Sequence, residues 1–147
     1  MKDNINFRSF KEGDYEICCE WWKWWWKKVG LDPVQRVFLP KDERCFVLEK
    51  DGIPIVATFL FLTEIPIVAW TTYLVSNPEY KEKDRRDLIK LLIKNVEKEA
   101  EKIGIMQLFT ICMNDHMTNI HKDLDWILMP VQNEGFKYLT NNFIKQK

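Results

Sequence analysis

The chain has 147 residues, 46% of them hydrophobic, and its 22 Lys and Arg residues balance its 22 Asp and Glu residues. This length predicts a single domain over residues 1–147, and the hydrophobic content excludes a disordered chain. Because balanced charge gives no long-range attraction to polyanions, we expect neither a nucleic-acid partner nor a membrane partner.

The chain shows no targeting or membrane-spanning segment. The first ten residues lack the apolar core of a signal peptide, and the longest apolar stretch, 53–75, is interrupted by Pro54, Glu64 and Pro66. The four cysteines form no CxxC pair and have no metal-ligand spacing with the two histidines, so we expect reduced thiols and no metal. The sequence thus predicts a cytoplasmic protein.

The N-terminal third begins with a short strand and a helix. Alternating residues predict a strand over 5–8, and Asp14 is expected to cap a helix that runs to about residue 29, where Gly30 ends it. The following residues, 31–44, contain two prolines and are expected to be irregular or to form a short second helix.

The predicted first helix contains five tryptophans. With about 100° of rotation per residue, one stripe is expected to face the sheet, and it groups Ile17, Trp21, Trp24 and Trp25. Trp22 and Trp26 fall on another side with Cys18. One buried stripe does not need that many indoles, so we expect some indole surface, that of Trp22 and Trp26, to meet a ligand, a second subunit or the next loop.

A three-stranded antiparallel meander follows. Strands are expected over 45–50, 53–62 and 67–75, and the first two are joined by Asp51-Gly52, a hairpin turn sequence in which glycine tolerates positive φ.

The C-terminal half alternates helices and strands. After a polar loop, apolar residues at helical spacing predict a helix over 86–103, which Gly104 ends. A strand over 105–112 is expected to pair in parallel with 67–75. The remaining expected elements are a helix over 114–124 and strands over 126–129 and 136–144. The fold class is therefore mixed α+β, with a mostly antiparallel sheet of about six to seven strands, helices on both faces and a βαβ crossover.

The element order and residues 74–89 resemble the GCN5-related N-acetyltransferase family. Members carry a strand, then V-x-P-x-[YF]-[RK]-G-[KRQ]-G-x-G, then a long helix. Residues 77–81, Asn-Pro-Glu-Tyr-Lys, match this pattern, and Lys83 matches its basic position, but Glu82, Asp84 and Arg86 replace its three glycines. The chain is most similar to small phage-encoded members with a tryptophan-rich first helix, which would place it in the host cytoplasm.

The resemblance implies acetyl-CoA as co-substrate and no metal. In the family, the pantetheine arm pairs with the strand before the loop, and loop amides and the helix N-terminus hold the pyrophosphate. The implied cofactor-binding residues are Tyr73, Leu74, Val75, Lys81, Lys83, Asp84, Arg85, Arg86 and Asn114. However, Asp84 is also well placed to cap the helix and occupy those amides. A working cofactor loop and a merely well-capped surface helix remain alternatives.

Three residues are candidates for proton transfer. The family often uses a Glu on the central strands as base, and here Glu64 lies only in the turn before 67–75, where a solvated role is the alternative. The family's usual acid is a Tyr on the helix after 105–112, but 114–124 contains no Tyr. His116 and His121 lie there instead, and either can act as acid or base.

Two functions follow from the resemblance. The first is an acyl-CoA-dependent N-acyltransferase that acts by direct transfer on a small-molecule or protein amine, with Trp22 and Trp26 beside the acceptor. The second is a catalytically degenerate relative that binds a protein, or assembles as a homodimer, through its tryptophan-rich helix. The matching residues 77–81 favour the first, and the missing glycines favour the second.

Overall fold

One five-stranded sheet forms the centre of the computed structural model, which describes residues 4–129, 137 and 139. The strands lie in chain order and are β1 (Ile5–Ser9), β2 (Cys45–Lys50), β3 (Ile53–Leu62), β4 (Val68–Ser76) and β5 (Gln107–Thr110). The first four pair antiparallel, and β5 pairs with β4 in parallel. The expected meander and βαβ crossover are confirmed.

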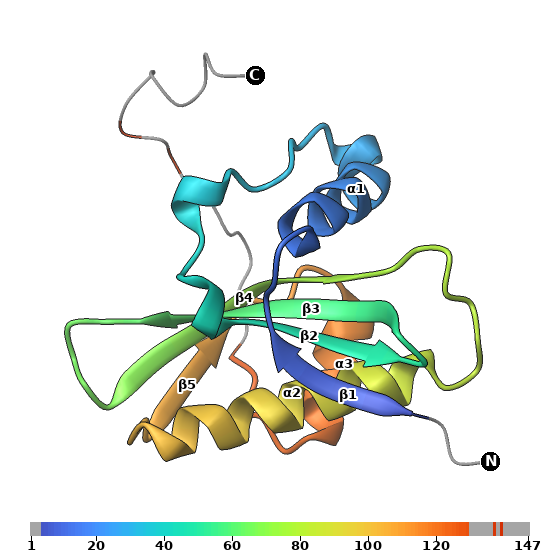
Figure 1. Ribbon diagram of the computed structural model, residues 1–147. Coiled ribbons are helices and arrows are strands. Elements are labelled where there is room, and N and C mark those ends of the chain that lie inside the picture. Colours follow the sequence, from blue (N-terminus) through green and yellow to red (C-terminus); the bar gives the residue numbers. More distant parts are fainter. Residues whose placement is uncertain (1–3, 130–136, 138, 140–147) are drawn as a thin grey trace.

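Helices cover both faces of the sheet (Figure 1). They are α1 (Asp14–Trp26), α2 (Arg85–Lys102) and α3 (Asp115–Asp123), with short 3₁₀ turns at Lys27–Val29, Arg36–Phe38 and Asp42–Arg44. Helix α1 lies on one face, and α2 packs against the other together with Ile120 of α3.

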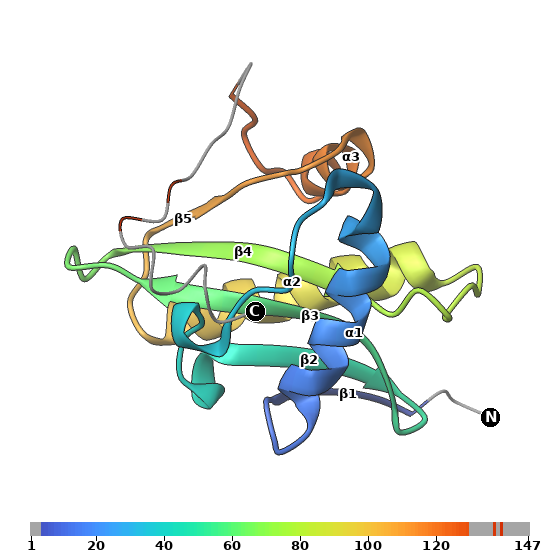
Figure 2. The same cartoon turned by 90° about the horizontal axis from the view of Figure 1, so that it is seen from above.

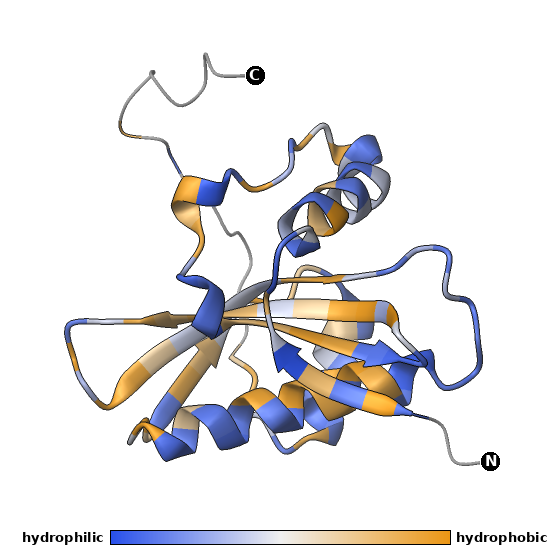
Figure 3. Ribbon diagram, viewed as in Figure 1, coloured by the Kyte–Doolittle hydropathy of each residue, from blue (hydrophilic) through white to orange (hydrophobic). Residues whose placement is uncertain are grey.

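The centre of the sheet is buried on both faces because β2 and β3 carry mostly apolar residues at successive positions rather than at alternate ones. Along β2, Cys45 and Val47 join the core under α1, whereas Phe46 and Leu48 join the core under α2. Figure 3 shows hydrophobic residues concentrated in the strands and on the side of α2 that faces them. At the β2–β3 turn, Asp51 and Gly52 have φ values of 52° and 79°, which confirms the expected hairpin.

Helix α1 is rotated relative to the expected orientation. Its buried residues are Asp14, Cys18, Trp21 and Trp22, whereas Trp24 and Trp25 are exposed. The physical reason is an anchor at the first turn: Asp14 does not cap the helix but accepts bonds from Arg8 at 2.6 Å and from the Lys11 amide at 2.7 Å. This buried ion pair turns the face that carries Trp22 toward the sheet.

The sheet has fewer strands than the sequence suggests. The expected strand over 126–129 is wrong, because these residues pair with no strand among those described, and the expected strand over 136–144 lies outside the described residues except for 137 and 139. Within the described part of the chain, no helix has the length and apolar character needed to span a membrane.

Candidate active site

Strands β4 and β5 separate halfway along β4. Their pairing runs from Val68 with Gln107 to Thr71 with Thr110 and stops there, although β4 continues to Ser76. Beyond that point the chain moves away from β4 toward α3 (Figure 2). A pocket of about 280 Å³ lies at the separation, lined by residues of α1, β4, α2 and α3. We call residues 72–76 the open half of β4 and residues 68–71 its closed half.

A β-bulge marks the start of the open half. The partners of β4 on β3 shift between Phe59, which faces Thr72, and Ala57, which faces Val75, so that Tyr73 and Leu74 both lie opposite Thr58. Tyr73 has φ 61°, a left-handed conformation that is costly for a bulky residue. Such strain is typical of functional sites, and here it lies in the wall of the pocket.

The open half presents backbone polar groups to the pocket. The Asn77 amide donates to the Ile55 carbonyl at 2.7 Å, so Asn77 faces β3. Because successive residues of a strand direct their backbone groups to opposite sides, Ser76 directs its N–H and C=O toward the side that β5 has left. An extended ligand with amide groups can therefore pair with this edge.

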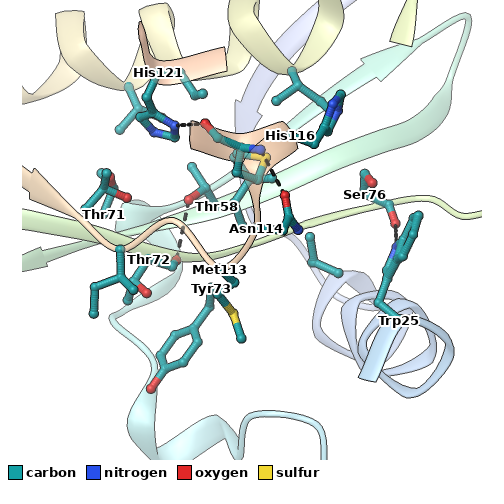
Figure 4. A pocket seen from close by; sticks show the side chains of 18 of the residues that line it. Trp25, Thr58, Thr71, Thr72, Tyr73, Ser76, Met113, Asn114, His116 and His121 are labelled. Carbon is teal, nitrogen blue, oxygen red and sulfur yellow. Dashed lines mark hydrogen bonds between the residues drawn. The ribbon is translucent and has the colours of Figure 1, made fainter. Parts of the chain in front are cut away.

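Three side chains meet at the end of the open half. The Trp25 indole N–H donates to the Ser76 carbonyl at 2.7 Å (Figure 4). Arg85 donates to the Ser76 hydroxyl at 2.6 Å. The Arg85 guanidinium also lies over the Trp25 ring, 4.9 Å from its centroid. Burial lowers the pKa of Arg85 from its usual value, but an arginine stays charged. The pocket thus has a cationic group at this end.

Of the two alternatives for this loop, the one in which Asp84 caps α2 is not what the structure has. Asp84 occupies the N-cap position but makes no side-chain cap hydrogen bond. Its carboxylate instead accepts from Lys50 at 2.6 Å and from the Tyr80 hydroxyl at 2.5 Å, and these donors hold the pKa of Asp84 below its usual value. Among the first amides of α2, that of Arg85 donates to the Glu82 carbonyl at 3.2 Å. The next ones, which have no intrahelical acceptors, are not covered by the Asp84 carboxylate.

The two histidines of α3 both line the pocket, and Figure 4 shows them on the opposite side of β4 from Tyr73 and Met113. His121 is buried, and its Nδ1 lies 2.8 Å from the Met117 carbonyl and 3.5 Å from Cys112 Sγ. Since only a protonated Nδ1 can donate to a carbonyl, the lone pair of neutral His121 is on Nε2.

Both imidazoles are biased toward the neutral form. Burial lowers the pKa of His121, and the bond to Met117 opposes this only in part. Burial, Arg86 and Arg85 lower the pKa of His116. Near neutral pH both rings are therefore better suited to accept a proton than to donate one.

The pocket brings together residues from distant parts of the sequence. The expected site residues that line it are Tyr73, Leu74, Val75, Arg85, Asn114, His116, His121 and Trp26. Asn114 also caps α3, because its side chain accepts from the Met117 amide at 2.9 Å.

Other expected site residues lie elsewhere. Glu64 is in the β3–β4 turn, at the opposite end of β4 from the open half. Lys81 and Lys83 are exposed in the loop before α2, and Arg86 bonds Asp123 of α3 at 2.9 Å. The expectation that Trp22 meets a ligand or a subunit is wrong: Trp22 is fully buried and stacks between Trp26 and Phe59.

Some residues of the site had not been expected from the sequence. The sequence pattern puts Trp25 in the core stripe and Ser76 in the polar loop after 67–75, and it marks Thr58 and Lys50 only as strand residues. The rotation of α1 explains why Trp25 lies at the pocket and not in the core. Lys50 and Asp84 meet across 34 positions of sequence, and no local pattern signals such a pair.

No protein-family model and no curated protein sequence matches the chain. Solved structures do. N-acetylglutamate synthase from Neisseria gonorrhoeae, complexed with coenzyme A and N-acetyl-glutamate, is similar with a TM-score of 0.66 and 17% identity, over 83% of this chain and 28% of that one. An aminoglycoside acetyltransferase from an uncultured soil metagenomic sample, complexed with sisomicin, is similar with a TM-score of 0.65 and 9% identity, over 94% of this chain and 97% of that one. An aminoglycoside N-acetyltransferase in complex with CoA is similar with a TM-score of 0.60 and 12% identity, over 93% of this chain and 97% of that one.

These similarities show the fold. The chain has the fold of the N-acetyltransferases it is similar to, which confirms the expected α+β class. It spans only 28% of the N-acetylglutamate synthase, but nearly the whole length of the two aminoglycoside enzymes.

Proposed function

We propose that this protein is an N-acyltransferase that uses acetyl-CoA as acyl donor and an amine as acceptor. The observation that carries the proposal is the open half of β4. It offers a strand edge inside a pocket that also reaches the start of α2. The similar structures that contain coenzyme A support the choice of donor.

The residues of the site fit a coenzyme A molecule. The pantetheine arm, which contains two amides, would lie along residues 73–76 and pair with the backbone of Ser76. The pyrophosphate would lie at the start of α2, where free amides and the helix dipole favour an anion, with Arg85 nearby.

The missing glycines are compatible with this arrangement. Glycine in such a loop allows a phosphate to approach the backbone closely. Two of the replacing side chains are tied back by ion pairs: Asp84 to Lys50 at 2.6 Å and Arg86 to Asp123 at 2.9 Å. Held in this way, they leave the start of α2 accessible.

The chemistry would be direct transfer. Acetyl-CoA supplies a thioester carbonyl, and the acceptor nitrogen attacks its carbon, so that a C–N bond forms and the C–S bond breaks. Backbone N–H groups beside the bulge at Tyr73 would polarise the carbonyl oxygen. His121 or His116 would accept the proton that the amine loses, and the thiolate would take a proton from that imidazolium or from water.

The lining also bears on the acceptor. Among its described residues Arg85 is the charged one, and none is Asp or Glu. A polycationic acceptor would find no counter-charge there, whereas an amine with an apolar or flat body fits beside Trp25, Trp26 and Tyr73.

Calorimetry with acetyl-CoA tests the proposal, followed by detection of free CoA thiol in the presence of an amine panel. We expect binding in the micromolar range to low millimolar range, weakened by Lys83→Glu at the loop. Lys98→Glu, which makes the same charge change on an exposed position of α2, should bind like the wild type. Absence of heat and of any thermal shift at millimolar acetyl-CoA would leave the fold without this function.

A non-catalytic binding module is the second candidate, and one observation favours it. Trp24 is 58% exposed although it is a large aromatic residue. Such residues are enriched at interfaces. Size-exclusion chromatography of Trp24→Ala tests this candidate: a dimer that becomes a monomer supports it, and an unchanged oligomeric state removes its basis.

A further inference from the structure

We propose that Trp25 closes the end of the β4 edge, and that the pantetheine arm of the acyl donor displaces the Trp25 indole from the Ser76 carbonyl when it binds. The inference rests on the proposed function and adds a residue that controls access to the donor site. Trp25 would thus compete with the donor rather than bind it.

The competition follows from where the Ser76 carbonyl points. The Asn77–Ile55 bond fixes Asn77 toward β3, so the Ser76 carbonyl faces the slot that β5 has left. The amide N–H groups of a pantetheine arm need such acceptors on this edge. The acceptor is already engaged by the Trp25 N–H at 2.7 Å, and the indole itself lines the pocket.

Trp25 is also held loosely enough to move. Its side chain is 39% exposed, and it lies in the last turn of α1, just before the 3₁₀ turn at Lys27–Val29. By contrast, Trp22, one turn earlier, is fully buried between Trp26 and Phe59 and cannot leave without opening the core. One hydrogen bond, one cation–π contact and an edge-to-face contact with the exposed ring of Trp24, 4.6 Å between ring centroids, hold the closed position.

Arg85 links the movement to the charge of the site. In the closed position its guanidinium lies over the indole and donates to the Ser76 hydroxyl. When the indole leaves, the face of the guanidinium that it covered becomes accessible at the end of the pocket nearest α2. The same displacement thus frees both the carbonyl for pantetheine and the cation for a phosphate.

The variant Trp25→Phe tests the proposal because it keeps one aromatic ring under Arg85 and removes the indole N–H together with the second ring of the indole. Breaking one neutral hydrogen bond corresponds to an affinity gain of about three- to tenfold. We expect acetyl-CoA to bind Trp25→Phe more tightly by this factor. Trp24→Phe, which keeps an aromatic ring against Trp25 and has no contact to Ser76, should bind like the wild type.

S-acetylpantetheine, which lacks the nucleotide and all phosphates, shows whether the pantetheine part of the donor alone accounts for the gain in affinity. The gain in Trp25→Phe should persist with this probe, because it arises at the Ser76 carbonyl. Equal or weaker binding of both probes by Trp25→Phe overturns the proposal while leaving the proposed function intact. If neither the wild type nor the variants bind acetyl-CoA, the proposed function fails and the displacement fails with it.

A second measurement avoids dependence on the stability of the variant. In the ¹⁵N spectrum of the wild type, the indole N–H signal of Trp25 can be assigned by its loss in Trp25→Phe. On addition of acetyl-CoA, exchange of this proton with solvent should accelerate, since it leaves its acceptor. Slower exchange would mean that the indole stays bonded in the complex, which contradicts displacement.

Discussion

The two halves of β4 differ in what they pair with. Residues 68–71 have β3 on one side and β5 on the other, whereas residues 72–76 keep β3 and lose β5. The change happens within one strand, at a bulge around Tyr73. One element thus serves both as part of a rigid core and as the wall of a pocket, because the closed half fixes the position of the open half.

The comparison predicts that substitutions in the two halves affect different properties. Changes in the packed core on either face of the sheet should reduce stability, and changes at the pocket along the open half should alter ligand binding.

The largest effect is expected at Trp22, which stacks on Phe59 in the core beneath the sheet. Trp22→Ala should lower the free energy of unfolding by about 3–5 kcal/mol, because it removes a fully buried aromatic side chain. Trp24→Ala, on the exposed side of the same helix, should stay within about 0.5 kcal/mol of the wild type. Urea unfolding measures both. Similar losses in the two variants would contradict the observed rotation of α1.

Lys50→Met should weaken acetyl-CoA binding at the start of α2, next to the open half of β4. Without Lys50, the Asp84 carboxylate keeps only the Tyr80 hydroxyl as a side-chain partner among the described residues, so it can turn to cap α2 and occupy amides that a phosphate needs. Acetyl-CoA binding should weaken up to about tenfold, which corresponds to about 1.4 kcal/mol. The double variant Lys50→Met with Asp84→Ala should recover most of the loss. A double variant that binds no better than Lys50→Met would show that the Lys50 charge itself contacts the donor.

Glycine substitutions should affect stability differently in the two halves of β4, because Tyr73 in the open half has a positive φ. At φ 61°, glycine is free of the strain that alanine carries, so Tyr73→Gly should be more stable than Tyr73→Ala by about 1 kcal/mol. In the closed half the order should reverse: Ala69→Gly should lose about 0.5–1 kcal/mol, since glycine weakens an ordinary strand. Thermal unfolding of the three variants checks this. Tyr73→Ala being the more stable of its pair would contradict the bulge.

His121 gives the smallest effect, a dependence of stability on pH. Its pKa in the folded state is below the value of about 6.5 expected in the unfolded chain. The unfolded state therefore binds its proton first as pH falls, and the folded state loses stability below about pH 6.5. His121→Gln should flatten the slope of the unfolding midpoint between pH 7 and pH 5, whereas His116→Gln, at an exposed position, should change it less. An unchanged slope in His121→Gln would show that this histidine is not buried as a neutral ring.

Local signals predicted most of the fold. The strands at Cys45–Lys50 and Ile53–Leu62 have the expected bounds. The Asp51-Gly52 turn fixes where the first of them ends and where the second begins. The helix at Arg85–Lys102 follows from its apolar period and from Gly104. The rotation of α1 could not be predicted from period alone, because tryptophans occur on several of its sides and the Arg8–Asp14 ion pair selects one.

The site was predictable only in outline. The element order predicted that β4 and β5 would meet, which is confirmed, whereas the anion site that the loop motif indicates stays a prediction. The sequence could not decide whether Asp84 caps α2, because the direction of its carboxylate depends on Lys50, which is far away in sequence. Trp25 was missed for a similar reason: its acceptor is the carbonyl of Ser76, 51 positions along the chain.

Residue-resolved hydrogen exchange with and without acetyl-CoA tests the central claim most directly. If the open half of β4 is the donor site, amide protection should rise at Tyr73–Ser76 and in the first turn of α2, with no change in the closed half or in β1 and β2. Unchanged exchange throughout at saturating acetyl-CoA, or protection confined to a different surface, would contradict the account.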